Sequence, residues 1–376
     1  MTPPVVPITA SERATGRAGG AAETAAAPPV VLQVNHLSTD FHLNKGTVHA
    51  VIDLTFSVHE REVLAIVGES GSGKSVTALS VMRLLQPPGR VAAGEVVFKG
   101  RDLLTLSKRE MRDIRGNQIS MIFQEPMTSL NPVFTIENQL TESIRAHLDI
   151  GRKAAAKRAV EMLRLVGIPD PEKRIKDYPH QMSGGMRQRV MTAMALACDP
   201  QLLIADEPTT ALDVTIQAQI LALIAELRDK IGMAVLLITH DLGVVAETAD
   251  RVIVMYCGYI VEEAAAEDLF ENPKHPYTLG LLKSLPTMED TDSSEPLQTI
   301  AGMVPNPMNM PKGCPFAERC DGRMARCEVE IPELYEFEGR WLRCFLFDPG
   351  AGVDSAGAAC SDGTAVDPLS APEARG

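Results

Sequence analysis

Aromatic residues and basic charge are both scarce in this sequence of 376 residues. Aromatics make up 4%, and 36 Lys and Arg are outnumbered by 49 Asp and Glu, which leaves a net charge of −13. This balance argues against nucleic-acid binders, which normally carry a basic patch. No apolar run approaches the ~18 residues that a bilayer-spanning helix needs. No basic segment followed by an apolar one opens the chain, so we expect no secretory signal peptide.

Two low-complexity ends enclose a long globular body. Ala, Pro, Gly and Thr supply 20 of the first 29 residues. Residues 1–29 are therefore expected to be a disordered tail, and residues 348–376 have the same character. Residues 30–286 alternate short apolar runs with helical patterns, which indicates an α/β domain. Residues 287–347 contain frequent Pro and Gly and a group of cysteines, and we expect a small appended module there.

Local patterns predict several elements of the α/β body. The apolar run at 63–67 is typical of a strand buried on both faces. A helix is expected over 74–86, stopped by Pro87 and Pro88. Further predictions are buried strands at 202–205 and 235–238, a capping box at 107–110 that opens a helix, and two helices within 136–167, the second over 152–166.

Residues 68–75 have the sequence GESGSGKS, which matches the pattern G-x-x-x-x-G-K-[ST]. The match lies between the expected strand and the expected helix, as a phosphate-binding loop requires. The glycines let backbone N–H groups turn toward phosphate oxygens, and the helix N-terminus adds partial positive charge. We expect Lys74 to reach the β- and γ-phosphates and Ser75 to ligate Mg²⁺. The predicted nucleotide contacts are Gly68, Glu69, Ser70, Gly71, Ser72, Gly73, Lys74, Ser75 and Val76.

Polar residues also follow the two other buried strands. Asp206 comes directly after 202–205 and is suited to hold Mg²⁺ through its water shell, while Glu207 can polarise the attacking water. His240 follows 235–238 and is expected at the same sheet edge as a γ-phosphate sensor. The structural alternatives are a carboxylate pair at a helix N-terminus and a histidine that only makes hydrogen bonds.

The order of these motifs resembles that of an ABC ATPase over residues 30–261. The matching elements are the phosphate loop, a Q-loop Gln124, a signature Ser183-Gly184-Gly185 followed by Met186, the pair Asp206-Glu207, a D-loop with Asp213, and the switch His240. The resemblance implies an α/β P-loop NTPase of the ABC type. It would have a RecA-like core, an antiparallel β subdomain and a helical subdomain at about 125–185. It also implies that Gln124, Ser75 and Asp206 serve Mg²⁺, and that the signature residues contact ATP held by a partner subunit.

Two segments narrow the resemblance to the ATPases of oligopeptide/dipeptide importers. Residues 123–132 are similar to the extended Q-loop of that group, and residues 314–316 with 319–320 are similar to its C-terminal region. Met186, where most ABC proteins have Gln, is similar to the D-type subunit of the paired ATPases. The resemblance therefore implies an F-type ATPase partner in a heterodimer, two transmembrane permease subunits, an extracytoplasmic solute-binding protein and a position at the cytoplasmic face of the membrane.

The implied function is ATP hydrolysis that drives peptide import, with no nucleic-acid partner. Nickel or glutathione-like solutes stay open as cargo, and a soluble ABC ATPase acting outside transport is the competing class. For the aromatic residue that stacks on adenine, Phe41 is the first candidate and Phe56 the alternative. A role in the hydrophobic core competes for both.

Four of the seven cysteines lie within 31 residues, spaced C-x5-C-x6-C-x16-C. Clustered cysteines in a reducing compartment more often bind metal than form disulfides. Four thiolates suit Zn²⁺ or a [4Fe–4S] cluster, and this spacing is unlike that of structural zinc sites. The resemblance to importer ATPases, some of which carry a cluster in this region, favours [4Fe–4S], with zinc or no metal as alternatives. The expected ligands are Cys314, Cys320, Cys327 and Cys344.

Overall fold

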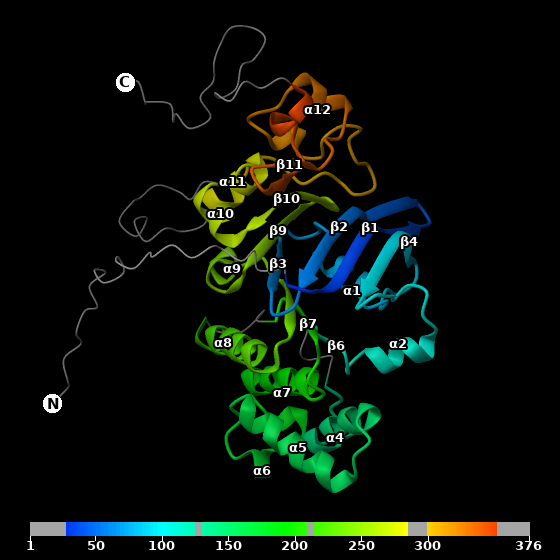
Figure 1. The fold of residues 1–376 in the computed structure, drawn as a ribbon, viewed down its shortest axis with the longest axis vertical. Coiled ribbons are helices and arrows are strands. Elements are labelled where there is room, and N and C mark those ends of the chain that lie inside the picture. The colour runs from blue at the N-terminus through cyan, green and yellow to red at the C-terminus, as the bar shows by residue number, and fades with distance from the viewer. Residues whose placement is uncertain (1–27, 125–129, 209–213, 285–298, 352–376) are drawn as a thin grey trace, which may run out of the picture.

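The structure is a computed structural model that describes residues 28–124, 130–208, 214–284 and 299–351. In these ranges, helices cover two β-sheets (Figure 1). The strands are β1 Val30–Leu43, β2 Gly46–His59, β3 Val63–Val67, β4 Gly89–Phe98, β5 Arg101–Asp102, β6 Ile119–Ile122, β7 Leu202–Asp206, β8 Ala234–Ile238, β9 Arg251–Tyr256, β10 Tyr259–Ala265, β11 Tyr335–Phe337 and β12 Arg340–Leu342. The helices are α1 Lys74–Val81, α2 Lys108–Ile114, α4 Ile136–His147, α5 Arg152–Leu165, α6 Pro171–Arg174, α7 Gly184–Leu196, α8 Val214–Ile231, α9 Leu242–Thr248, α10 Ala266–Glu271, α11 Pro276–Lys283 and α12 Ala325–Val329.

The larger sheet has the strand order β11-β12-β10-β9-β3-β8-β7-β6. Strand β3 lies between β9 and β8 and pairs with both in parallel, and β8, β7 and β6 continue the parallel arrangement. All five residues of β3, β7 and β8 are buried. The apolar runs that predicted three buried strands are therefore confirmed, because parallel strands covered on both faces need no polar alternation.

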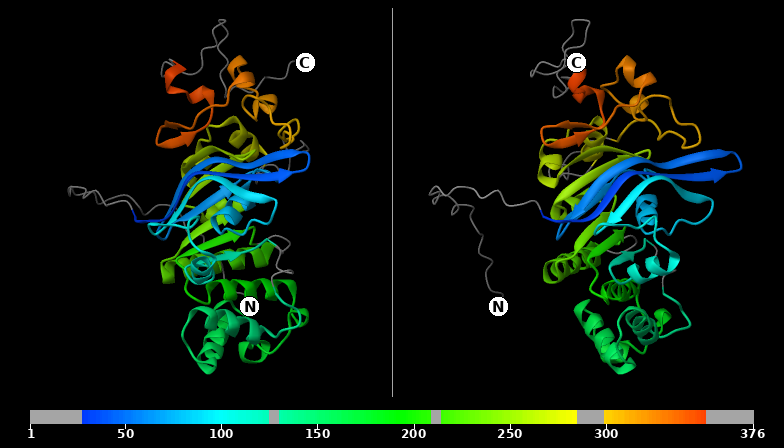
Figure 2. Two further views of the ribbon diagram at one scale, coloured as in Figure 1. Left: turned by 90° about the vertical axis from the view of Figure 1, so that its right-hand side faces the viewer. Right: turned by 45° about the vertical axis from the view of Figure 1, so that its right-hand side comes forward.

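The smaller sheet is antiparallel, with the order β2-β1-β4-β5. Its apolar side packs with α1 and one face of the larger sheet into a shared core that includes Leu32, Leu54, Val96, Ile66 and Met255. The views in Figure 2 show this blue and cyan sheet lying against the central strands. A second core joins the opposite face of the larger sheet to the helices α4, α5 and α7.

The helical insert, α4 to α6, lies at the end of the molecule opposite the C-terminal segment, residues 299–351 (Figure 1). Thr135 begins α4 by accepting a hydrogen bond from the N–H of Asn138. Helix α5 ends at Leu165, and Gly167 follows with a φ of 72°, which favours glycine. Two helices within 136–167 were predicted, and both form. The capping box at Ser107 and Glu110 also forms at the start of α2.

The helix after the phosphate loop is shorter than predicted. The sequence indicated 74–86, but α1 ends at Val81, well before the two prolines. Arg83 adopts a left-handed conformation with a φ of 51°, which a continuing helix cannot contain. The Arg115 side chain donates to the carbonyls of Met82 (2.9 Å) and Arg83 (2.8 Å). A distant arginine thus satisfies carbonyls that would otherwise need a further helical turn.

In the part that the structure describes, the C-terminal segment is joined to the larger sheet and does not form a sheet of its own. Strand β12 pairs with β10, where Glu262 lies opposite Leu342 and Glu263 opposite Trp341. A third core includes Tyr256 of β9, Tyr277 of α11 and Phe316 of the C-terminal segment. Within the described ranges, no helix combines the length and the apolar character that crossing a membrane requires.

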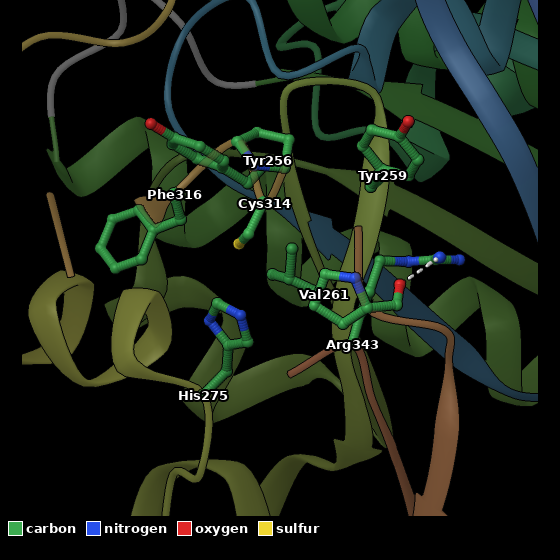
Figure 3. Close-up of a pocket in the computed structure, with 9 residues that line it drawn as sticks. Tyr256, Tyr259, Val261, His275, Cys314, Phe316 and Arg343 are labelled. Atoms are coloured by element: carbon green, nitrogen blue, oxygen red, sulfur yellow. Dashed lines mark hydrogen bonds between the residues drawn. The ribbon is translucent and has the colours of Figure 1, made fainter. Parts of the chain in front are cut away.

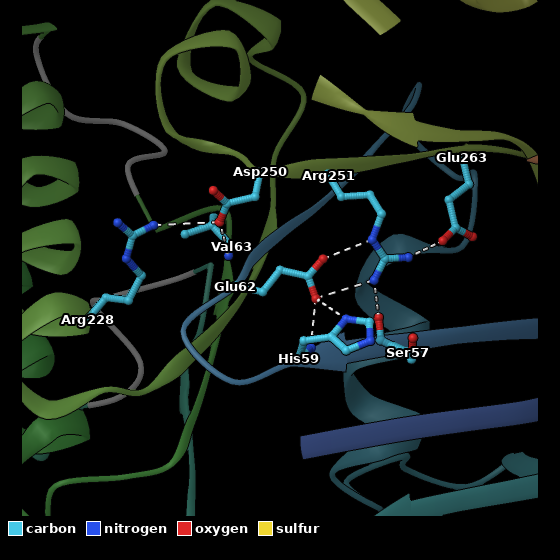
Figure 4. Close-up of polar contacts among 8 residues, drawn as sticks. All are labelled: Ser57, His59, Glu62, Val63, Arg228, Asp250, Arg251 and Glu263. Atoms are coloured by element: carbon cyan, nitrogen blue, oxygen red, sulfur yellow. Dashed lines mark hydrogen bonds and ion pairs between the residues drawn. The ribbon is translucent and has the colours of Figure 1, made fainter. Parts of the chain in front are cut away.

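A largely buried ion network lies where β9 begins (Figure 4). The Arg251 guanidinium is paired with Glu62 at 2.8 Å and with Glu263, and it donates to the Ser57 carbonyl. Burial raises the pKa of Glu263. Burial also acts to raise the pKa of Glu62, but the hydrogen bond and charge of Arg251 outweigh it and lower that pKa. The arginine therefore compensates two carboxylates that the fold has removed from water.

Candidate functional site

The phosphate loop connects β3 to α1 and depends on glycine at both ends. Gly68 has a φ of +148°, and a Cβ placed there would lie 2.2 Å from the Met255 carbonyl oxygen. Gly73 has a φ of +105°, and its Cβ would lie 2.5 Å from the Ala50 carbonyl oxygen. Neither position can hold a side chain without moving backbone. The two glycines thus let the loop lie directly against β9 and β2.

Lys74 is the first residue of α1, and its ammonium group lies inside the loop. Its Nζ donates to the carbonyl oxygens of Gly68 at 2.7 Å and Glu69 at 3.0 Å. The residue is only 6% exposed. Burial lowers its pKa, and the carboxylates of Glu207 and Asp206 oppose that shift. A lysine that the loop carbonyls hold in this way is suited to meet phosphate oxygens.

Ser75 and Asp206 bring a hydroxyl and a carboxylate together across the sheet. Ser75 Oγ donates to Asp206 Oδ1 at 2.9 Å. Burial raises the pKa of Asp206, and the hydrogen bond from Ser75 opposes this. Mg²⁺ takes oxygen ligands, commonly one or two from the protein with waters and phosphate oxygens completing its shell. The donor atoms at this position therefore fit Mg²⁺ in type and number.

Glu207 lies between Gln124 and His240 at the carboxyl ends of the strands. Gln124 Nε2 donates to Glu207 Oε2 at 2.8 Å, and His240 Nδ1 lies 3.3 Å from Glu207 Oε1. The backbone of Glu207 has a φ of +46°, and its N–H donates to the Ile238 carbonyl at 2.8 Å. Such a conformation is uncommon outside glycine and often marks a functional position. The sequence predicted all three side chains for one site, and the structure brings them together.

The signature residues begin a different helix. Ser183 Oγ accepts the N–H of Met186 at 3.3 Å and caps α7, whose first turn contains Gly184 and Gly185. Ser183 and Gly184 are exposed, Gly185 is buried and Met186 is half-buried. The exposed helix start offers a hydroxyl and backbone N–H groups to a ligand outside the chain. Asp213, the predicted D-loop residue, lies outside the described residues, as do positions 125–129 of the extended Q-loop.

The two candidate adenine-stacking residues differ in exposure. Phe56 is 4% exposed and belongs to the core between the sheets. Phe41 is half-buried in β1, where it lies opposite Val48 and Gly89, and a Cβ on Gly89 would come within 2.6 Å of its ring. Burial therefore removes Phe56 as a nucleotide contact, and the role of Phe41 stays a prediction.

The sequence reasoning missed one contact of the phosphate loop. The Glu69 carboxylate forms a two-point ion pair with Arg319, at 2.7 Å and 3.0 Å. The Glu69 N–H donates to the Tyr277 hydroxyl at 2.8 Å. The pair spans 250 residues, and no local pattern in either segment could have indicated it.

The four clustered cysteines line one small pocket in the C-terminal segment. Burial raises the pKa of Cys314, that of Cys320 to about 11 and that of Cys344 to about 12. Cys327 is buried, and its carbonyl accepts the N–H of Cys314 at 2.8 Å. Four thiols around one pocket match the donor set of a metal site in type. As the described side chains stand, no three His, Cys, Asp or Glu are positioned to hold one metal ion.

This fold and this arrangement of motifs define an ATP-binding cassette (ABC) ATPase, in which the phosphate loop, Asp206, Glu207 and His240 meet at one sheet edge. The ABC transporter family matches residues 51–210. The C-terminal region of oligopeptide/dipeptide transporters matches residues 261–327. The chain belongs to the ATP-binding proteins of the oligopeptide/dipeptide ABC transporter family.

Similar proteins cover more than four fifths of the chain. The oligopeptide transport ATP-binding protein AppD of Bacillus subtilis is 52% identical over 320 residues, which is 85% of this chain and 97% of AppD. A probable peptide ABC transporter ATP-binding protein, y4tR of Sinorhizobium fredii, is 55% identical over 310 residues, or 82% of this chain and 92% of that protein. Among solved structures, the dimeric cassette MJ0796 bound to ADP and Pi matches with a TM-score of 0.57 and 26% identity. The match covers 62% of this chain and 98% of that one.

Proposed function

We propose that this chain is the ATP-hydrolysing subunit that drives import of peptides through a membrane permease. The observation that carries the proposal is the combination of a phosphate loop and the Gln124, Glu207 and His240 grouping with a C-terminal region of the oligopeptide/dipeptide transporter type. The names of AppD and of the dipeptide transport protein DppD of Bacillus subtilis, which is also 52% identical, support peptides as cargo. Nickel or glutathione-like solutes are the alternative cargo.

The roles of the site residues follow from their positions. Lys74 and the loop N–H groups bind the phosphates, and Ser75 and Asp206 serve Mg²⁺. Glu207 is the general base for the attacking water, held between Gln124 and His240. The Gln124 amide donates to Glu207 in this conformation. To ligate Mg²⁺, the Gln124 side chain would have to turn toward Ser75. His240, whose side chain is 65% exposed, remains accessible to a γ-phosphate.

Ser183, Gly184, Gly185 and Met186 complete the ATP site of a second subunit. We assign that subunit to the F-type ATPase of the same importer, which makes the active unit a heterodimer. Two permease subunits and an extracytoplasmic solute-binding protein complete the assembly, and this chain sits at the cytoplasmic face. ATP-driven closure reaches the permease through the segment after Gln124 and the helices α4 and α5.

The test compares ATP hydrolysis by the isolated chain and by the assembled complex. We expect slow turnover alone and faster turnover when the F-type subunit and the permeases are added, because each signature completes the other subunit's site. A matched assembly that contains Gly185→Trp, which places a large side chain at the signature, should lose this gain. Full activity of the isolated chain as a homodimer would contradict the heterodimer.

The finer proposal for the C-terminal segment is that Cys314, Cys320, Cys327 and Cys344 hold a [4Fe–4S] cluster, with zinc as the alternative. Their common pocket supports this, and the thiols must come closer together than they stand here. When bound, the cluster would act as a structural cross-link, since metal binding supplies folding free energy to small segments. Analysis of iron, sulfide and zinc in protein purified without oxygen decides between the two metals.

A further inference from the structure

The phosphate loop is held from outside by the C-terminal segment. Arg319 extends from the turn before Cys320 to Glu69, the second residue of the loop. Its two terminal nitrogens lie 2.7 Å and 3.0 Å from the two carboxylate oxygens of Glu69. This two-point arrangement fixes the orientation of the Glu69 carboxylate and also pairs its charge, whereas a single contact would leave the carboxylate free to rotate.

The surroundings of Arg319 hold its side chain in one position. The side chain is 4% exposed. Its guanidinium also donates to the Tyr256 hydroxyl at 3.2 Å and to the Ala301 carbonyl at 3.1 Å. The guanidinium carbon lies 5.8 Å from the centre of the Tyr256 ring and 5.9 Å from that of Phe316. An arginine held by this many partners loses little further freedom when it binds a carboxylate.

Three aromatic rings from separate parts of the chain support this contact. The ring centres of Tyr256 and Tyr277 are 4.6 Å apart, and Phe316 lies 5.3 Å from the first and 5.4 Å from the second. In Figure 3, Tyr256 and Phe316 stand beside a small pocket that Cys314 and His275 also line. The phenol of Tyr277 accepts the Glu69 N–H at 2.8 Å.

Every polar group of Glu69 is therefore engaged. Its N–H is bound by Tyr277, its carboxylate by Arg319, and its carbonyl by Lys74, the lysine expected to meet the phosphates. The first two partners follow β10 in sequence, and only the third belongs to the loop. If the Glu69 carboxylate lost Arg319, the phosphate loop would be less ordered before nucleotide binds. Binding would then have to order the loop, which lowers the nucleotide affinity.

We propose that Arg319 is a positioning residue for the ATP site, and that the C-terminal segment acts through it to preorganise the phosphate loop. The inference goes beyond the proposed transport function and rests on ATP binding at Lys74. It gives the segment that carries the cysteines a direct effect on nucleotide affinity, although none of its residues lies in the phosphate loop.

The test measures MgATP affinity of the full-length chain by calorimetry. Arg319→Met keeps the apolar stem and removes the charge, and we expect the dissociation constant to rise about tenfold, the scale of one lost charge-assisted contact. Glu69→Gln breaks the same pair from the other side and should weaken binding similarly. Because both act through one contact, the double variant should bind no worse than the weaker single variant. Arg319→Lys should recover part of the affinity.

Arg326→Met is the matched control. Arg326 belongs to the same segment, pairs with Glu330 and Asp348 at 2.7 Å each, and lies 4.1 Å from the Phe345 ring. It has no contact with the loop among the described residues, so its loss should leave MgATP affinity unchanged within about twofold. Affinity that is unchanged in Arg319→Met and Glu69→Gln, or lowered equally in Arg326→Met, would overturn the proposal. If Arg319→Met does not fold, the MgATP affinity of Glu69→Gln tests the proposal.

Lys74→Ala distinguishes failure of this proposal from failure of the ATP site on which it rests. MgATP binding that is retained in Lys74→Ala would contradict the ATP site itself.

Discussion

The phosphate loop and the C-terminal segment are constructed in opposite ways. The loop is one continuous stretch between β3 and α1, and its lysine binds carbonyls five and six residues away. The C-terminal segment takes its structure from distant partners. Strand β12 pairs with β10 about 80 residues earlier, and Arg319 reaches Glu69 across 250. Contacts within the loop define most of the first region, to which Arg319 and Tyr277 add long-range contacts, whereas the second region requires the finished cassette.

This difference teaches where sequence patterns carry information. The sequence of a motif such as residues 68–75 predicts its conformation, because the flexible glycines, the helix start and the lysine lie within eight positions. The C-terminal segment has short elements, the longest of them the five residues of α12, and few local signals. Its order comes from packing on Tyr256 and Tyr277 and from ion pairs. Variants that remove a local contact should therefore differ from variants that remove a long-range contact. We expect the two kinds to differ in how large the loss is and in which property, activity or stability, is lost.

The largest expected effect is on chemistry at the sheet edge. Glu207→Gln should reduce ATP hydrolysis by the assembled complex ~10²–10⁴-fold, the usual range for the loss of a positioned general base. ATP binding should persist, because Lys74 and the loop are unchanged. Steady-state hydrolysis together with nucleotide binding measures both. Glu226→Gln, at an exposed carboxylate paired with Lys230, is the control and should hydrolyse at the normal rate.

A large effect on stability is expected from a long-range contact. Arg251→Met leaves the buried Glu263 and the half-buried Glu62 without their ion-pair partner, and breaking a buried ion pair costs about 3–5 kcal/mol. Denaturant unfolding gives the free energy. Arg228→Met removes a more exposed pair with Asp229 and Asp250 and should cost below about 1 kcal/mol. Equal losses of unfolding free energy in the two variants would mean that burial does not make the Arg251 network more stabilising than the exposed pairs of Arg228.

The metal uptake that we propose for the C-terminal segment should depend on pH. Burial raises the pKa of Cys320 to about 11 and that of Cys344 to about 12, so both thiols are protonated at neutral pH. Each must release a proton to ligate metal. Affinity should therefore rise with pH, about tenfold per unit for each proton released. Metal titration of the metal-free protein between pH 6 and 8 measures the slope, with Cys320→Ser as the test variant and Cys360→Ser as its control. Affinity independent of pH would contradict thiolate ligation.

The smallest effect is expected from a local contact. Ser107→Ala removes the hydroxyl that caps α2 at 3.3 Å from the Glu110 N–H, which costs about 1 kcal/mol. Ser107→Thr retains the capping hydroxyl, which also donates to the Glu110 carboxylate, and should restore most of the loss. The free energy of unfolding of the three proteins checks this. A loss as large as that of Arg251→Met would remove the distinction between local and long-range contacts.

Prediction from the sequence followed the same division. The strands β3, β7 and β8, the loop, the cap at Ser107 and the placement of Glu207 and His240 followed from local patterns, and Gln124 was added by the resemblance to ABC ATPases. The end of α1 did not, because Arg115 lies more than 30 residues from the carbonyls that it satisfies. The Arg319 contact and the pairing of β12 with β10 have the same cause. Their determinants lie on two segments that only the folded chain brings together.

The proposed transport function is tested most directly by coupling of hydrolysis to cargo. The complex of this chain, its ATPase partner and the permeases is placed in vesicles, and ATP hydrolysis is measured as peptide-loaded binding protein is added. We predict that hydrolysis rises with the loaded protein and that peptide accumulates inside, and that Glu207→Gln abolishes both. Hydrolysis that does not respond to the loaded binding protein, with no peptide accumulation, would contradict the account.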